Sequence, residues 1–183
     1  MMELDITELF EEVVRKLPEG LEILYPNGKG GAKIVKSPRL NYIFGSSQYI
    51  KDILDEYSKS PGQSEKKFPL VALFTPIYED RSDPNYFSIV CSSCKEWSNE
   101  ERRTTSFKNI LRPIYKRLLE VLYEDFRFDC DCDEKVKHSY SENYSYGRYG
   151  AYTDSGKAVS EPIDAINIRS MEIKINNLNC RRK

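Results

Sequence analysis

The chain has 183 residues, of which 39% are hydrophobic and 31% charged, so it can bury a core and has the composition of a soluble globular protein. A formal net charge of −1 excludes a global positive field that would draw it onto nucleic acid or an anionic membrane. No apolar run approaches the ~20 residues of a membrane span, and the acidic N-terminus is unlike a signal peptide. We therefore expect a cytosolic protein whose five cysteines are not disulfide-bonded.

Helical and strand patterns alternate through the first half of the chain. Apolar residues recur at helical spacing after Asp5, which can cap the helix, and the pattern stops at Pro18. The apolar run 69–74 is bounded by prolines, which is typical of a strand that is buried on both faces. In chain order, the sequence predicts a helix at 6–17, a strand at 21–25, a turn-rich loop at 26–31, one or two strands within 32–44, a helix from about 47 to 57, a linker at 58–67, and strands at 69–74 and 86–91.

The most regular segment is SFKNILRPIYKRLLEVLYEDF, residues 106–126. Ser98 and Glu101 have the spacing of a capping box, so the helix begins just after Ser98. An unbroken apolar stripe then follows the helix. Pro113 lies inside this stripe, lacks a backbone N–H and clashes with the preceding turn. We therefore expect a kink or two abutting helices.

A polar stretch, residues 127–160, separates the long helix from the last apolar segment. Loops of this length are uncommon unless they bind something or are mobile. Alternation in PIDAINIRSMEIKI predicts a long strand with a bulge near Ser170. The sequence therefore predicts an α+β fold, with a mainly antiparallel sheet and helices packed on one side. Its parts are a single core domain at 1–126 and 161–176, an acidic and tyrosine-rich loop or arm insertion at 127–160, and a basic C-terminal tail at 177–183.

Charged and aromatic residues are concentrated in and after the long helix. Basic positions in the helix have few acidic neighbours, and an acidic stretch follows the helix. A chain with both a basic face and an acidic edge is suited to head-to-tail association of copies around a ring. Tyrosines among serines and glycines have the composition of a contact surface. A solvated charged face and a disordered insertion are the alternatives. The candidate interface residues are Arg102, Arg103, Lys108, Arg112, Lys116, Arg117, Asp129, Asp131, Asp133, Tyr144, Tyr146 and Tyr149.

A zinc site is one competing hypothesis. Cys91 and Cys94 form one close pair and Cys130 and Cys132 another, and four thiolates can bind zinc tetrahedrally. The second pair has one intervening residue, whereas structural zinc sites usually have at least two. A cysteine at a strand end beside a solvated acidic loop is the simpler interpretation.

A metal-dependent nuclease is another hypothesis. Asp164, Glu172 and Lys174 have the residue types that hold a divalent metal and position a water. On one extended strand the two carboxylates would lie about 26 Å apart, at roughly 3.3 Å per residue, so a charged face of an edge strand is favoured. A DNA-binding module is the third alternative, in which Arg102 and Arg112 contact phosphates.

Three stretches carry a resemblance to known proteins: FPLVALF, EERRTTSFKNILRPIYKRLLE and PIDAINI. They resemble a group of small virion proteins of tailed bacteriophages, particularly phages of gut Bacteroidales. In the order of its elements, the chain is also similar to tail-terminator and head–tail joining proteins. The similarity covers about residues 6–125 and 161–175. It implies a non-enzymatic viral structural protein that forms a symmetric homo-oligomeric ring in the neck or tail.

The resemblance also implies partners and a location. The partners would be copies of the chain in a closed ring and adjacent ring, portal or tail proteins, with DNA passing through the lumen without specific binding. No membrane, metal or cofactor is implied. Assembly would take place in the bacterial host cytoplasm, and the mature location would be the virion. Contacts between rings would come from the loop 27–33 and the insertion 127–160.

Overall fold

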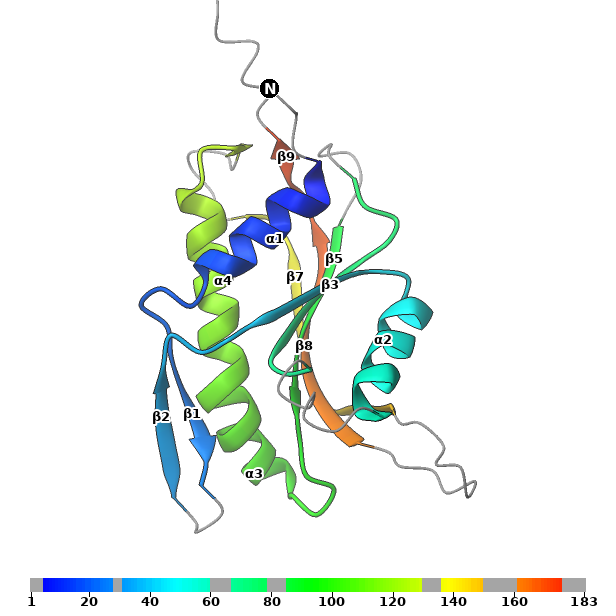
Figure 1. Cartoon of the computed structure of the whole chain (residues 1–183). Helices are drawn as coiled ribbons and strands as arrows, with labels where there is room; N and C mark the ends of the chain where they lie inside the picture. The colour runs from blue at the N-terminus through cyan, green and yellow to red at the C-terminus, as the bar shows by residue number, and fades with distance from the viewer. Residues whose placement is uncertain are drawn as a thin grey trace, which may run out of the picture.

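The computed structural model describes residues 5–27, 31–59, 67–78, 85–129, 136–149 and 161–175. These residues form an α+β fold with one five-stranded sheet and two two-stranded sheets, flanked by helices (Figure 1). The predicted α+β class is confirmed. No helix in this part of the chain has the length and apolar character that crossing a membrane requires.

The chain begins with helix α1 (Ile6–Lys16) and a hairpin of β1 (Glu22–Pro26) and β2 (Ala32–Lys36). The carboxylate of Asp5 caps α1, because it accepts hydrogen bonds from the backbone N–H groups of Thr7 at 2.7 Å and Glu8 at 3.0 Å. The hairpin is a separate two-stranded antiparallel sheet.

The main sheet contains, in spatial order, β3 (Asn41–Gly45), β4 (Leu70–Phe74), β5 (Asn85–Ser92), β8 (Glu161–Met171) and β7 (Ser139–Tyr149). Helix α2 (Ser47–Lys59) is the crossover between the parallel strands β3 and β4. The other pairs, β4–β5, β5–β8 and β8–β7, are antiparallel. The sheet is therefore mixed but mainly antiparallel, as predicted.

The long helical segment consists of α3 (Asn99–Arg102), the π-helix η2 (Arg103–Leu111) and α4 (Arg112–Glu124). The predicted capping box is present: Ser98 N–H donates to Glu101 at 2.7 Å, and Glu101 N–H donates to the Ser98 hydroxyl at 3.2 Å. Pro113 lies in the first turn of α4, where a missing N–H is tolerated. The wider π turns precede it, so the segment is a series of abutting helices.

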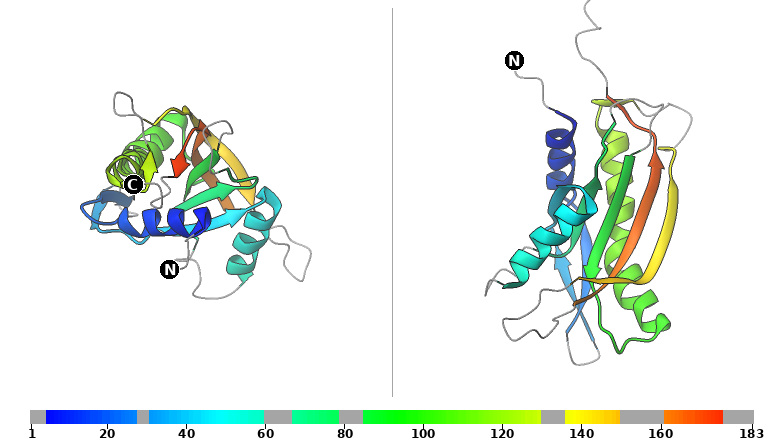
Figure 2. Two further views of the ribbon diagram at one scale, coloured as in Figure 1. Left: turned by 90° about the horizontal axis from the view of Figure 1, so that it is seen from above. Right: turned by 90° about the vertical axis from the view of Figure 1, so that its right-hand side faces the viewer.

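Helices cover both faces of the sheet, which corrects the prediction that they lie on one side. The larger core joins α1, η2 and α4 to inward residues such as Val71 and Ile89. A second core joins Ile50 and Leu54 of α2 to the opposite face, which includes Ala165. Seen from above, α4 and α2 lie on opposite sides of the sheet (Figure 2). Strands buried on both faces require this second cover, which the βαβ crossover provides.

Part of the predicted insertion 127–160 belongs to the sheets. Two residues form β6 (Phe128–Asp129), which pairs with β9 (Lys174–Ile175), and β7 is a long edge strand that pairs with β8.

The predicted bulge is confirmed, because β8 carries one extra residue opposite β5 and Ser170 has a φ of 54°.

Candidate contact surface

Several of the candidate residues gather between α4 and β7. Residues 140, 142 and 144 alternate along β7 and point toward the helix, where residues 112 and 115 lie one turn apart. We call this cluster the Tyr–Arg strip. Its members are Arg112, Tyr115, His138, Tyr140, Glu142 and Tyr144.

Glu142 is the ionic centre of the Tyr–Arg strip. The Arg112 guanidinium donates from Nε to Oε1 at 2.6 Å and from Nη2 to Oε2 at 3.0 Å, a bidentate geometry. Tyr144 donates its hydroxyl to Oε2 at 3.2 Å, and Tyr140 donates to Oε1. These bonds, chiefly those from Arg112, lower the pKa of Glu142 below its ordinary value. The carboxylate therefore stays ionised and fixes three side chains.

Tyr115 and His138 hold the other end of the strip. The Nδ1 of His138 lies 2.6 Å from the Val136 carbonyl oxygen, which can only accept, so Nδ1 carries the proton. The His138 Nε2 then accepts from the Tyr115 hydroxyl at 2.6 Å. The Tyr115 ring lies 4.8 Å from that of Tyr140, centroid to centroid. Tyr140 is nevertheless 41% exposed. The strip thus presents aromatic area that is already held in place.

The other basic candidates divide into paired and unpaired residues. Arg103 donates from Nε to Glu100 at 2.9 Å, and Arg117 donates to Glu120 at 3.3 Å. Lys108 and Lys116 are exposed on the same helical segment and have no ionic partner in the part of the chain that the structure describes. Only these two lysines therefore keep an uncompensated charge among the surface cations predicted on the helix.

Arg102 is a correction, because it lies inside the protein and its side chain is only 4% exposed. Its guanidinium donates to Asp164 at 2.7 Å and to the Cys94 carbonyl at 2.7 Å. Asp164 is fully buried and also accepts from the Ser106 hydroxyl at 2.6 Å. Arg102 therefore joins the N-terminal end of the long helical segment to β8 and is not part of the exposed surface.

The remaining interface candidates lie in or beside β7 and β6. Tyr146 and Tyr149 belong to β7. Asp129 belongs to β6, where the strand register places its backbone opposite that of Lys174 in β9. Asp131 and Asp133 lie outside the described residues.

The nuclease candidates are not assembled into a site. Asp164 is buried in the sheet against Arg102 and Ser106, whereas Glu172 is exposed beyond the end of β8. Lys174 lies in the short strand β9. The nuclease hypothesis requires the carboxylates of Asp164 and Glu172 to bind the same metal. In the structure one carboxylate is buried and hydrogen-bonded and the other is exposed, so the hypothesis is not supported.

The zinc candidates are only partly described. Cys91 is buried in β5, and burial raises the pKa of its thiol to about 12. Cys94 is half-buried and donates to Glu96 at 2.9 Å. Cys130 and Cys132 lie outside the described residues. Within the described ranges, no three His, Cys, Asp or Glu side chains lie together as a metal site would need.

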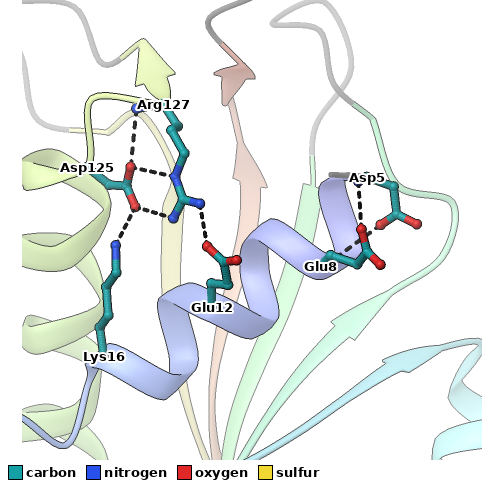
Figure 3. Close-up of polar contacts among 6 residues, drawn as sticks. All are labelled: Asp5, Glu8, Glu12, Lys16, Asp125 and Arg127. Atoms are coloured by element: carbon teal, nitrogen blue, oxygen red, sulfur yellow. Dashed lines mark hydrogen bonds and ion pairs between the residues drawn. The ribbon is translucent and has the colours of Figure 1, made fainter. Parts of the chain in front are cut away.

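A second ionic cluster anchors α1 to the end of α4 (Figure 3). Asp125 accepts from Arg127 Nη2 at 2.7 Å and from Lys16 Nζ at 3.0 Å. Arg127 also donates to Glu12 on α1. The acidic stretch that follows the helix was expected to meet a neighbouring chain. Asp125, the first acidic residue after α4, instead forms ion pairs within the protein.

The sequence of residues 140–144 contains a signal for the Tyr–Arg strip. Tyr140, Glu142 and Tyr144 recur with a period of two, which predicts one face of a strand. This strand face carries the acidic residue Glu142, which can pair with a basic residue of the long helix. Tyr115 and His138 gave no such signal, because their contact depends on how β7 docks.

The comparisons with known proteins add no family to these observations. No protein-family model matches the chain, and no curated protein matches it.

Proposed function

We propose that this protein is a non-enzymatic structural subunit of a phage virion and forms a symmetric homo-oligomeric ring at the head–tail connector or tail. The observation that carries the proposal is the Tyr–Arg strip, a half-exposed surface of tyrosine and arginine held by internal hydrogen bonds. The resemblance of three sequence stretches to virion proteins supports the same function.

The chemistry of the strip suits a protein partner. Tyrosine and arginine are enriched at the centres of protein interfaces, where they contribute large contact areas. A side chain already fixed by Glu142 or His138 loses little conformational entropy when a partner covers it. The strip is therefore prepared for contact before assembly.

The charge pattern favours protein contact over DNA contact. Arg112 and Arg103 are neutralised by Glu142 and Glu100, so few cations remain for phosphates. DNA binding through this face would show a steep dependence on salt, because each phosphate contact releases counterions. We expect DNA affinity to be weak and unchanged by Arg112→Ala.

Substitution of Tyr140 tests whether the strip mediates assembly. Tyr140→Ala removes exposed aromatic area without opening the core, so we expect it to lower the association constant of the ring about tenfold or more, the effect of one interface hot spot. Native mass spectrometry and light scattering of the full chain over a concentration series would measure this. Tyr123→Ala is the matched control, since Tyr123 on α4 is 60% exposed. Equal effects of the two substitutions would contradict a specific role for the strip.

A further inference from the structure

Four cations lie in one row along the long helical segment. Lys108, Arg112 and Lys116 are four residues apart, which is close to one helical turn in both η2 and α4, so their side chains leave the segment on the same side. Arg103 belongs to this row, because its guanidinium interacts electrostatically with that of Arg112 and with Tyr144. We call these four cations the basic row.

The basic row carries more positive than negative charge. Its two arginines are each paired with one acid, at Glu100 and at Glu142. Its two lysines are exposed and have no ionic partner in the ranges that the structure describes. Four cations against two acids leave an excess of two positive charges. Glu120, the next acid along the helix, does not change this balance, because it pairs with Arg117.

Glu142, the acid beside the centre of the row, has no acceptor capacity left. A carboxylate offers about four lone-pair positions, and Glu142 accepts two hydrogen bonds from Arg112, one from Tyr140 and one from Tyr144. Arg112 has further N–H donors beyond those that bind Glu142, and its side chain is 36% exposed. The row therefore offers donors and positive charge, and a partner has to bring anionic acceptors.

The chain contains acids at a spacing that matches the row. Lys108 and Lys116 lie roughly 12 Å apart along a helix that rises ~1.5 Å per residue, with Arg112 midway. Asp129, Asp131 and Asp133 occupy alternate positions of the sequence, and we call them the acidic run. Side chains at alternate positions of an extended chain point to one side, and three of them span about 13 Å. The acidic run therefore matches the basic row in sign, number and length.

The acidic run cannot lie along the basic row of its own chain. Asp129 belongs to β6, and the N–H of Phe128 in that strand donates to the Asp125 carbonyl at 2.9 Å, which holds β6 at the C-terminal end of α4. This end lies roughly 13 Å beyond Lys116 along the helix axis. Lys108 is farther away still, at the other end of the row. A neighbouring copy has no such restriction.

We propose that the basic row of one copy binds the acidic run of the next copy. The outer carboxylates, Asp129 and Asp133, would pair with Lys108 and Lys116, and Asp131 would accept from Arg112. Because the row and the run are different surfaces of one chain, the contact is head-to-tail and can close into a ring. The inference rests on the proposed ring and identifies which groups meet within it.

Reversal of charge on each surface tests this contact in the full chain. The row variant is Lys108→Glu, Lys116→Glu, and the run variant is Asp129→Lys, Asp133→Lys. Each variant alone places like charges together, so we expect its association constant to fall at least tenfold. In an equal mixture, the row of each variant meets a complementary run on the other. We expect association within about threefold of wild type, with both variants in each assembly, measured by native mass spectrometry and light scattering.

A control variant and the other outcomes separate this contact from its alternatives. Lys51→Glu, Lys59→Glu makes the same charge change at the same spacing on α2, where both lysines are exposed, and it should leave association unchanged. A row variant that associates normally but loses affinity for duplex DNA would identify DNA as the occupant and overturn the inference. Weak association that the mixture does not restore would also overturn it, while a closed wild-type ring would still support the proposed function. A wild-type monomer at every concentration would overturn both.

Discussion

At the scale of single residues, the most consequential polar group is the buried pair of Arg102 and Asp164. The pair lies 62 positions apart in sequence and meets because β8 pairs beside β5. Taking two charges out of water is costly, and their attraction and additional hydrogen bonds offset this cost only while both partners are present. Ser106 provides one of those additional bonds.

Removal of Arg102 should therefore destabilise the protein strongly. Arg102→Ala leaves the Asp164 carboxylate buried without its cation, and we expect a loss of about 3–5 kcal/mol in the free energy of unfolding. Arg103→Ala is the adjacent control, because Arg103 pairs with Glu100 at the surface, and it should leave the denaturation midpoint almost unchanged. Chemical denaturation of both variants measures the difference. Similar midpoints for the two would contradict the structural role of Arg102.

The carboxylate of Asp125 gives a prediction about pH. Hydrogen bonds from Arg127, and then from Lys16, lower the pKa of Asp125 below its ordinary value. A group whose pKa is lower in the folded state contributes stability above its unfolded pKa of about 3.9 and loses it as pH falls through the folded pKa. Asp125→Asn should cost about 1–2 kcal/mol at pH 7, and the difference from wild type should shrink below about pH 4. A difference that does not vary with pH in denaturation experiments would argue against this cluster.

At the scale of elements, the π-helix η2 explains how the long helical segment accommodates a proline. A proline in a helix interior normally costs about 3 kcal/mol. Here the N–H of Arg112 donates to the Phe107 carbonyl, five residues earlier, and Pro113 lies in the first turn of the next α-helix, α4. The change of helix type thus places the proline where no donor is needed.

Proline substitutions at two positions test this explanation. Pro113→Ala should change the free energy of unfolding by less than about 1 kcal/mol, because it mainly adds freedom to the unfolded chain. Glu120→Pro, in the interior of α4, should cost about 3 kcal/mol or more. Thermal denaturation compares the two. Strong stabilisation by Pro113→Ala would mean that the proline strains the segment.

The sequence predicted some elements well because their signals are local. The helix cap at Asp5, the capping box at Ser98, the apolar stripe of α1 and the bulge at Ser170 each depend on residues within a few positions. The strand β7 was missed because Tyr140, Glu142 and Tyr144, which carry its period of two, are not a purely apolar set. The side of the sheet on which α2 packs was also missed, since it depends on the handed crossover between β3 and β4.

At the scale of the whole molecule, residue types alone could not identify the candidate surface. Arg102 and Arg103 are neighbours in sequence, yet one is buried and the other exposed. Arg112 belongs to the Tyr–Arg strip only because β7 brings Glu142 beside it. The predicted basic face of the long helix is thereby reduced mainly to Lys108 and Lys116.

Exposed surfaces lie on several sides of the described part of the molecule. The hairpin and α2 lie on opposite sides of the molecule (Figure 1), and the Tyr–Arg strip lies between α4 and β7. A subunit within a stack of rings needs surfaces for its own ring and for the rings above and below. This distribution supports the proposed structural function.

Direct imaging of native particles of a phage whose genome encodes this chain tests the central proposal most directly. Electron cryomicroscopy, with the chain located by its fold, should show copies related by rotation in a closed ring at the neck or tail. Each Tyr–Arg strip should be covered by another protein chain. Particles in which the chain is absent, or is present as a single copy with the strip facing solvent, would contradict the account.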